Sequence, residues 1–294
     1  MKPAARLLRW YRVHGRILPW RQTRDPYKIL VSEIMLQQTQ VERVKVFYRN
    51  WLKEFGSWKK LAAASNADVI IAWAGLGYNR RALALRDIAR QVVEQGVPTT
   101  EEDWQSLKGI GPYTAAALSA FAQQKRTLPI DTNIRRVLGR YYFGKTFPDL
   151  KDDIRIRRKT ESFLPKRGHY YDVPQAIFDL ATMICTKAPD CARCPLKSDC
   201  KAASKFLSGN VKIPKRSTPK PNERKHRDKR YPDRIYRGRI LKVVRVSVRV
   251  DSKKLGALID PHFDAMLDYK WVENMIDRLV KDGMIKRTKN TLSL

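Results

Sequence analysis

Apolar residues recur at helical spacing along most of the chain up to about residue 184. Glycine and proline mark the breaks between these stretches, at Gly56, at the turn 75–77 and at the turn 96–98. No alternation of period two appears before residue 230. This pattern predicts a mainly α-helical protein whose helices share a core, with apolar stripes such as Val31, Ile34, Met35, Val41, Val44 and Phe47.

The pattern changes after residue 209. Residues 210–239 hold twelve Lys and Arg, three Asp and Glu, and four Pro. This composition indicates a linker over 206–235 that is extended or poorly ordered when free. We expect a phosphate-tracking arm, and a solvated spacer is the alternative. Residues 236–294 predict a small α+β module, with helices at 253–259 and 270–281 and then a strand–turn–strand, which fits a winged helix.

The charge of the chain indicates what kind of partner it binds. The 294 residues include 60 Lys and Arg against 29 Asp and Glu, a formal net charge of +31. With 43% hydrophobic residues the chain is globular, so the excess indicates a polyanionic partner, most simply nucleic acid. No apolar run has the ~18 residues of a membrane helix, and no signal peptide is visible. We therefore expect an intracellular protein.

Two glycines, Gly109 and Gly111, separate two predicted helices in the stretch LKGIGPYTAAALSAFAQQ. Thr100 and Asp103 can cap the first helix, and the second is predicted over Thr114–Gln124. Glycines allow close approach of another molecule, and the helix start offers unsatisfied N–H groups to an anion. In so basic a chain the anion would be a DNA phosphate. An ordinary tight turn is the alternative.

Two carboxylates stand in contrasting local sequences. Glu33 is followed by the apolar run Ile34-Met35-Leu36, where a carboxyl can be desolvated and stay protonated near neutral pH, as a general acid requires. Asp131 precedes a helix start, where an N-cap carboxylate is ionised. Such a pair suits cleavage of a glycosidic bond. The alternatives are a solvent-facing Glu and a purely structural cap.

The four cysteines fall within sixteen residues, which indicates a metal site in an intracellular protein. Their thiolates can hold a [4Fe–4S] cluster or a tetrahedral zinc ion, and the spacing does not decide between them. A closed site of this kind is most often structural. The predicted ligands are Cys185, Cys191, Cys194 and Cys200.

A glutamine pair and an aromatic residue complete the candidates. The amides of Gln37 and Gln38 can read base edges, and Tyr78 after the 75–77 turn can wedge into a base stack. The alternative is ordinary, with solvated glutamines and a tyrosine packed on its neighbours.

Together these segments resemble the helix-hairpin-helix DNA glycosylases, and in particular the MutY-type adenine DNA glycosylases, which remove adenine mispaired with 8-oxoguanine. The resemblance covers about residues 5–203. The tail is too short and too basic for the Nudix-like domain with which those enzymes usually end. The segments that carry it are LPWR (18–21), DPYKILVSEIMLQQTQV (25–41), GLGY (75–78), LKGIGPYTAAA (107–117), PIDTNIRRVL (129–138), QAIFDLATMIC (175–185) and the four cysteines.

The resemblance implies a role for each site residue. Glu33 matches the acid that protonates adenine at N7 and then assists water, and Asp131 matches the carboxylate that stabilises the sugar cation. Tyr113 lies where the endonuclease III enzymes place a Schiff-base lysine, which implies a monofunctional glycosylase. The adenine pocket and the DNA contacts are implied at Trp20, Arg21, Leu36, Asp179, Gln37, Gln38, Tyr78, Lys108, Gly109 and Gly111.

The resemblance also implies a [4Fe–4S] cluster on the four cysteines and a monovalent cation at the hairpin. The expected fold is two-lobed, with one lobe over 25–125 and the other formed by the N-terminal segment and 126–205. We predict a monomeric enzyme that excises mispaired adenine from double-stranded DNA in base excision repair. The alternatives are a mismatch thymine or uracil glycosylase of the same fold and a non-catalytic, DNA-binding iron–sulfur protein.

Overall fold

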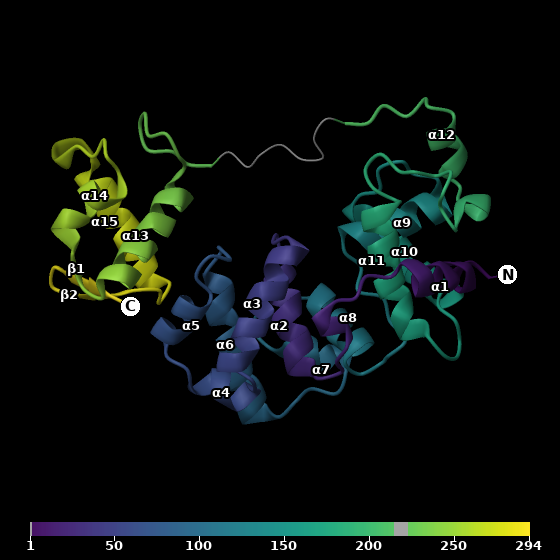
Figure 1. The fold of residues 1–294 in the computed structure, drawn as a ribbon, viewed down its shortest axis with the longest axis horizontal. Coiled ribbons are helices and arrows are strands. Elements are labelled where there is room, and N and C mark those ends of the chain that lie inside the picture. The colour runs from purple at the N-terminus through teal and green to yellow at the C-terminus, as the bar shows by residue number, and fades with distance from the viewer. Residues whose placement is uncertain (1, 215–222) are drawn as a thin grey trace. The chain divides into compact units, whose positions relative to one another are not determined.

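The computed structural model describes residues 2–214 and 223–294, and the middle of the predicted linker, 215–222, lies outside them. The fold is mainly helical (Figure 1). The chain divides into two compact units, one holding Met1–Glu33 and Val97–Lys215, the other holding Ile34–Gly96 and Arg216–Leu294. No helix within the described residues is long and apolar enough to cross a membrane.

The first unit is helical throughout its described part. Its core packs α9 against α11, and α1 also packs against α11. Leu7, Leu138, Ile177 and Leu180 are completely buried there, and each such side chain stabilises the fold by about 1.5–3 kcal/mol. The elements are α1 (Pro3–His14), η1 (Pro19–Arg21), α2 (Pro26–Leu36), α7 (Glu101–Ser106), α8 (Pro112–Phe121), α9 (Thr132–Phe143), η2 (Leu150–Asp152), α10 (Asp153–Phe163), η3 (Tyr170–Asp172), α11 (Val173–Met183), η4 (Lys197–Asp199) and α12 (Ala203–Leu207).

Local signals position the helices of this unit. The Thr100 hydroxyl accepts a hydrogen bond from Asp103 N at 3.0 Å, so the predicted cap of α7 is confirmed. Helix α8 begins at Pro112, two residues before the predicted start, because proline fits the first helical position, where no N–H is needed. It ends at Phe121, so the prediction of helix up to Gln124 was wrong.

The second unit contains the end of α2, four further helices and the C-terminal module. Helix α6 is its centre and packs against α4 and α5. The buried Trp51 and Trp73 meet edge to face at 5.3 Å between ring centroids. The helices before the module are α3 (Val41–Glu54), α4 (Trp58–Ala63), α5 (Asn66–Ala72) and α6 (Arg80–Gln95).

The C-terminal module has three helices and a three-stranded antiparallel sheet of order β1-β3-β2. Tyr236 and Trp271 pack edge to face in its core. The strand–turn–strand predicted at the end of the chain is confirmed. An extended linker was predicted up to residue 235, but α13 begins at Asp233, because its apolar face packs on α14 and α15. The elements are α13 (Asp233–Ser247), β1 (Val250–Asp251), α14 (Ser252–Ile259), α15 (Ala265–Lys281), β2 (Lys286–Thr288) and β3 (Thr291–Ser293).

Candidate active site

Glu33 lies on α2 and is 8% exposed. The Tyr113 hydroxyl donates a hydrogen bond to Glu33 Oε2 at 2.9 Å. Burial raises the pKa of Glu33 to about 7, while the Tyr113 bond lowers it and the charge of Asp131 raises it. The side chain can therefore keep its proton near neutral pH, which is the property of a general acid.

Asp131 is the N-cap of α9, as its sequence predicts. Its Oδ1 accepts hydrogen bonds from Asn133 N and Ile134 N, both at 2.8 Å, and its Oδ2 accepts one from Asn133 Nδ2 at 2.6 Å. Burial raises the pKa of Asp131, and these donors together with Arg136 work against that rise. Compared with Glu33, Asp131 has more groups that favour its ionised form, including the helix N-terminus.

Tyr113, on the first turn of α8, is the third predicted catalytic residue at this site. Burial raises the pKa of its phenol well above 10, and the charges of Glu33 and Asp131 raise it further. The phenol therefore remains a neutral donor at any physiological pH. The structure thus brings together the three predicted catalytic residues, from α2, α8 and the start of α9.

Arg21 is held in place by a carboxylate from α11. Its two terminal nitrogens donate to the two oxygens of Asp179 at 2.8 and 2.9 Å, and Arg16 donates to the same carboxylate at 2.7 and 2.8 Å. Burial works to raise the pKa of Asp179, but the two arginines outweigh it and lower that pKa. Arg21 is close enough to Glu33 for its charge to lower the pKa of Glu33. The neighbouring Trp20 is buried.

The residues predicted to intrude into DNA lie in the second unit. Leu36 ends α2 and is half-buried, whereas Gln37 and Gln38 are exposed. Tyr78 is 57% exposed at the 75–78 turn, so it is not simply packed on its neighbours. Gln38 and Tyr78 both have positive φ angles, of 55° and 48°, which are unfavourable for residues with a side chain.

Arg81 links the two turns that carry these residues. Its guanidinium donates to the carbonyl oxygens of Ile34 at 2.9 Å and Gly77 at 3.1 Å, and also to that of Gln37. It also lies over the Tyr78 ring, 5.5 Å from the centroid. The hydrogen bonds of one half-buried cation therefore fix both turns relative to each other.

The glycine hairpin joins α7 to α8. Gly109 has a φ of 105°, which a side chain would strain, and Gly111 is the N-cap of α8. Lys108 and Gly111 are exposed, and Ile110 is buried. The exposed backbone of the hairpin is therefore available to an external group such as a phosphate.

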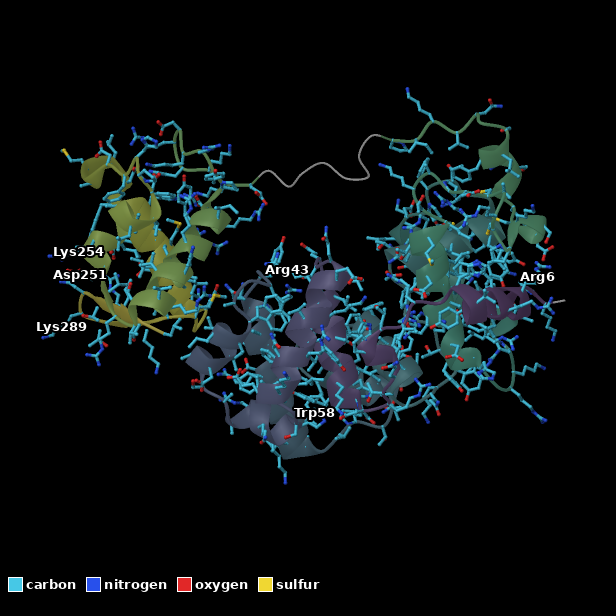
Figure 2. The ribbon with its side chains drawn as sticks, in the orientation of Figure 1. Arg6, Arg43, Trp58, Asp251, Lys254 and Lys289 are labelled. Atoms are coloured by element: carbon cyan, nitrogen blue, oxygen red, sulfur yellow. The ribbon has the colours of Figure 1, made fainter. Side chains whose placement is uncertain are left out.

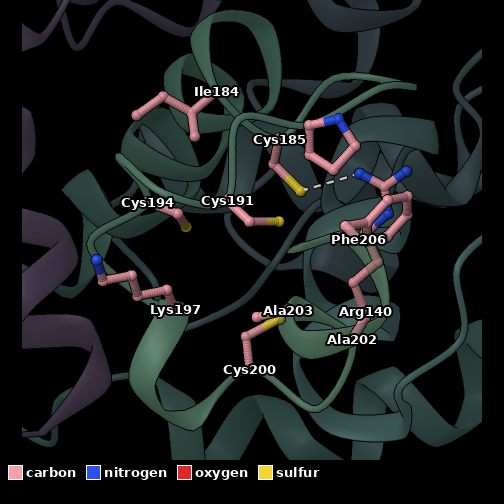
Figure 3. A pocket seen from close by; sticks show the side chains of 11 residues that line it. Arg140, Ile184, Cys185, Cys191, Cys194, Lys197, Cys200, Ala202, Ala203 and Phe206 are labelled. Atoms are coloured by element: carbon pink, nitrogen blue, oxygen red, sulfur yellow. Dashed lines mark hydrogen bonds between the residues drawn. The ribbon is translucent and has the colours of Figure 1, made fainter. Parts of the chain in front are cut away.

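The four predicted cysteines line one pocket, together with Arg140 and Phe206 (Figure 3). Arg140 donates to Cys185 Sγ at 3.3 Å and to the carbonyl oxygen of Thr186 at 2.6 Å. Within residues 2–214 and 223–294 no three His, Cys, Asp or Glu side chains converge tightly enough to hold one metal ion. The four thiols in one pocket form a donor set that suits a metal group.

A chain of hydrogen bonds leads from this loop to Asp131. Arg136 donates to the Cys185 carbonyl oxygen at 2.7 Å and to Asn133 Oδ1 at 3.0 Å, and Asn133 in turn donates to Asp131. Arg136 and Arg140 lie one turn apart on α9, so the same helix face contacts the metal loop twice. The cap carboxylate and the cysteine loop are thereby held by one helix.

Sequence reasoning missed four of these arginines as parts of the site. The available signal for Arg136 and Arg140 was their separation of four residues, which places both on one face of a helix. Arg81 follows a glycine turn and gave no signal, because its carbonyl partners are defined only by the fold. Arg16 gave none either, since Asp179 is 163 residues away.

Comparison with known proteins shows which family the chain resembles. Residues 31–166 match the HhH-GPD superfamily of base excision DNA repair proteins. A Mycobacterium tuberculosis protein named adenine DNA glycosylase is 37% identical over 195 residues, which are 65% of this chain and 64% of that protein. A Mycolicibacterium smegmatis protein of the same name is 33% identical over 96% of this chain and 92% of its own length.

Solved structures show the same fold. A thermostable thymine-DNA glycosylase matches with a TM-score of 0.63 and 29% identity, over 69% of this chain and 95% of its own. An endonuclease III trapped covalently on DNA matches with a TM-score of 0.58 at 18% identity, over 69% of this chain and 95% of its own, which speaks for the fold alone. The architecture is therefore a mainly helical HhH-GPD glycosylase fold with a small C-terminal three-stranded sheet. By its relatives, the chain belongs to the adenine DNA glycosylase family of that superfamily.

Proposed function

We propose that the protein is a monofunctional DNA glycosylase that excises adenine mispaired with 8-oxoguanine or guanine in double-stranded DNA. The observation that carries this proposal is the buried Glu33 with a pKa of about 7, hydrogen-bonded to Tyr113 and neighbouring the capped carboxylate Asp131. Relatives named adenine DNA glycosylase, at 33–37% identity, support the choice of base.

The chemistry divides between the two carboxyls. The adenine is first flipped out of the duplex, at a cost of a few kcal/mol. Glu33 gives its proton to N7, so the electrons of the breaking C1′–N9 bond pass to a neutral leaving base. Asp131 remains ionised beside the resulting positive sugar. Water then adds to C1′ and returns a proton to the Glu33 carboxylate, which leaves an abasic site.

Tyr113 supports a monofunctional reaction. A lyase cleaves the strand through an imine between a lysine and C1′, and a phenol cannot form an imine. The neutral phenol instead keeps Glu33 oriented through the 2.9 Å hydrogen bond.

Substrate contacts are proposed for two groups of residues. Trp20, Arg21 and Leu36 would line the adenine pocket, with Asp179 acting through Arg21, because all four of its hydrogen bonds go to arginines. In the duplex, contacts to the bases and the backbone would come from Gln37, Gln38, Tyr78, Lys108, Gly109 and Gly111. The carbonyl oxygens of the hairpin would also accept a monovalent cation.

A [4Fe–4S] cluster is the proposed occupant of the cysteine pocket. A single zinc ion needs four thiolates at about 2.3 Å from one point, whereas a cluster is bound by cysteines spread around its outside. All four cysteines line one pocket, which supports a shared metal group, and the resemblance to the MutY-type enzymes selects the cluster. When bound, it would fix the loop 185–200 in place.

The C-terminal module is proposed to be a winged helix that binds DNA. Its order of helix, strand, two helices and two strands, with the sheet order β1-β3-β2, supports this. In helix-turn-helix folds the second helix of the pair lies in the major groove. In this module that helix is α15.

A mismatch thymine glycosylase is the second candidate, because the solved thymine-DNA glycosylase shares the fold at 29% identity. A pyrimidine has no N7, so the protonated Glu33 favours a purine. Duplexes with A:8-oxoG, A:G, T:G and U:G pairs, cleaved with alkali after incubation, separate the two. We expect cleavage at adenine, whereas cleavage confined to thymine or uracil would reject the proposal.

A further inference from the structure

The C-terminal module presents more positive charge than its own fold needs. Residues 223–294 contain nineteen Lys and Arg against ten Asp and Glu. Several of the carboxylates serve internal contacts. Asp260 and Asp268 hold the buried Lys229 at 2.7 and 2.5 Å, and Asp233 accepts a hydrogen bond from Trp271 Nε1 at 2.9 Å. The remaining cations are therefore weakly compensated at the surface.

One face of α15 gathers a part of this excess. Lys270, Asn274 and Arg278 follow each other at intervals of four residues, so they lie in one row along the helix, and all three are exposed. In the described part of the chain no carboxylate lies within ion-pair distance of Lys270 or Arg278. The row is a polar, positive surface without an internal partner.

This row borders a hollow of about 240 Å³. Arg224 contributes a further cation from the segment before α13, with its Nε 3.9 Å from Asp233 Oδ2. His226, also in the lining, stacks on Trp271 with 4.8 Å between the ring centroids. The acidic residue in the lining, Asp233, accepts a hydrogen bond from Trp271 Nε1 through Oδ1 and pairs with Arg224 through Oδ2, so Lys270 and Arg278 are the cations of the lining without a carboxylate partner among the described residues. An anion entering the hollow would meet cations and an amide.

The neighbouring face of α15 is arranged differently. Glu273 and Asp277 lie there, and both pair with Arg287 of β2, at 2.6 and 3.5 Å. The helix thus separates a face that is neutralised within the module from the face of Lys270, Asn274 and Arg278. Exposed charges placed only for solubility would not need this separation.

We infer that Lys270, Asn274 and Arg278, together with Arg224, form a duplex-binding face that holds DNA outside the catalytic residues. The cations contact phosphates, and the Asn274 amide between them faces the groove, where an amide can pair with a base edge or a phosphate oxygen. The inference rests on the proposed function only in that the substrate is duplex DNA. The enzyme would gain affinity for any sequence through this face and leave base selection to the other unit.

The test is equilibrium binding of the full chain to a fully matched duplex at several salt concentrations. The variant Lys270→Gln/Arg278→Gln removes two charges from the face. The matched control is Lys253→Gln/Lys254→Gln, which removes two charges from α14, where both side chains are exposed outside the hollow (Lys254 is labelled in Figure 2).

We expect the face variant to bind about tenfold more weakly at ~0.1 M salt and to lower the slope of log K against log salt by about 1.8, because each lost phosphate contact removes about 0.9. The control should change much less. An unchanged affinity and slope, or an equal loss in the control, would overturn the inference. Single-turnover excision of adenine at saturating enzyme is the separate readout. If wild type excises none while the face variant still loses affinity, the function proposed above fails and the DNA-binding face stands.

Discussion

Replacing Glu33 with glutamine should stabilise the fold while it removes the activity. The pKa of Glu33 rises from 4.5 to about 7 on folding, so the folded state binds the proton more tightly than the unfolded state between these values. Stability contributed by this group is therefore lost as pH rises from about 4.5 to 7, and the loss is complete above 7. The glutamine carries no charge to desolvate, and its amide oxygen can still accept the Tyr113 hydrogen bond.

The size of the effect follows from the two pKa values. At pH 8 the raised pKa of Glu33 lowers the free energy of unfolding by about 3 kcal/mol. At pH 5.5 it lowers it by about 1.4 kcal/mol. The difference in free energy of unfolding between the Glu33→Gln variant and wild type should therefore grow by about 2 kcal/mol between pH 5.5 and pH 8, in favour of the variant. Any constant effect of the substitution on packing cancels in this difference.

Urea unfolding of both proteins at the two pH values measures this quantity. Glu54→Gln, at an exposed position of α3, is the control. Its free energy of unfolding relative to wild type should be the same at both pH values. A stability difference between Glu33→Gln and wild type that is the same at both pH values would refute the reasoning, because the carboxyl would then not be desolvated.

Further predictions concern the neighbours of this group. Tyr113→Phe removes a hydrogen bond that lowers the pKa of Glu33, so the alkaline limb of single-turnover excision, expected near pH 7 in wild type, should move to higher pH; an unmoved limb would contradict this. Arg81→Lys keeps the charge but loses most carbonyl contacts, so KM for a mismatched duplex should rise several-fold while kcat changes little, and a selective loss of kcat would reject that role. Cys200→Ser should lower the iron content and Tm together; full iron content would argue against Cys200 as a ligand.

Local features of the structure were the part that could be predicted from sequence. The caps at Thr100 and Asp131 are short-range hydrogen bonds between residues two or three positions apart, so composition and spacing were sufficient. The helix Ser252–Ile259 and the terminal strands follow from periodicity in the same way. By contrast, the whole of α13 was missed, because the segment is rich in Arg and Lys and its burial depends on helices later in the chain.

The electrostatics of the site could not be predicted in this way. The pKa of Glu33 depends on Tyr113, 80 residues away, and the position of Arg21 depends on Asp179, 158 residues away. These contacts arise only when α2, α8 and α11 are packed. The sequence limited the candidates by residue type, and the fold decided which donors each carboxylate received.

The central claim is that Glu33 is the proton donor for adenine. Single-turnover excision from a duplex with adenine opposite 8-oxoguanine, at saturating enzyme and neutral pH, tests it most directly in wild type, Glu33→Gln and the Glu54→Gln control. We predict that Glu33→Gln loses about 10²–10⁴-fold in rate, the range typical of a general acid, while the control keeps the wild-type rate. Excision by Glu33→Gln at the wild-type rate would contradict the account.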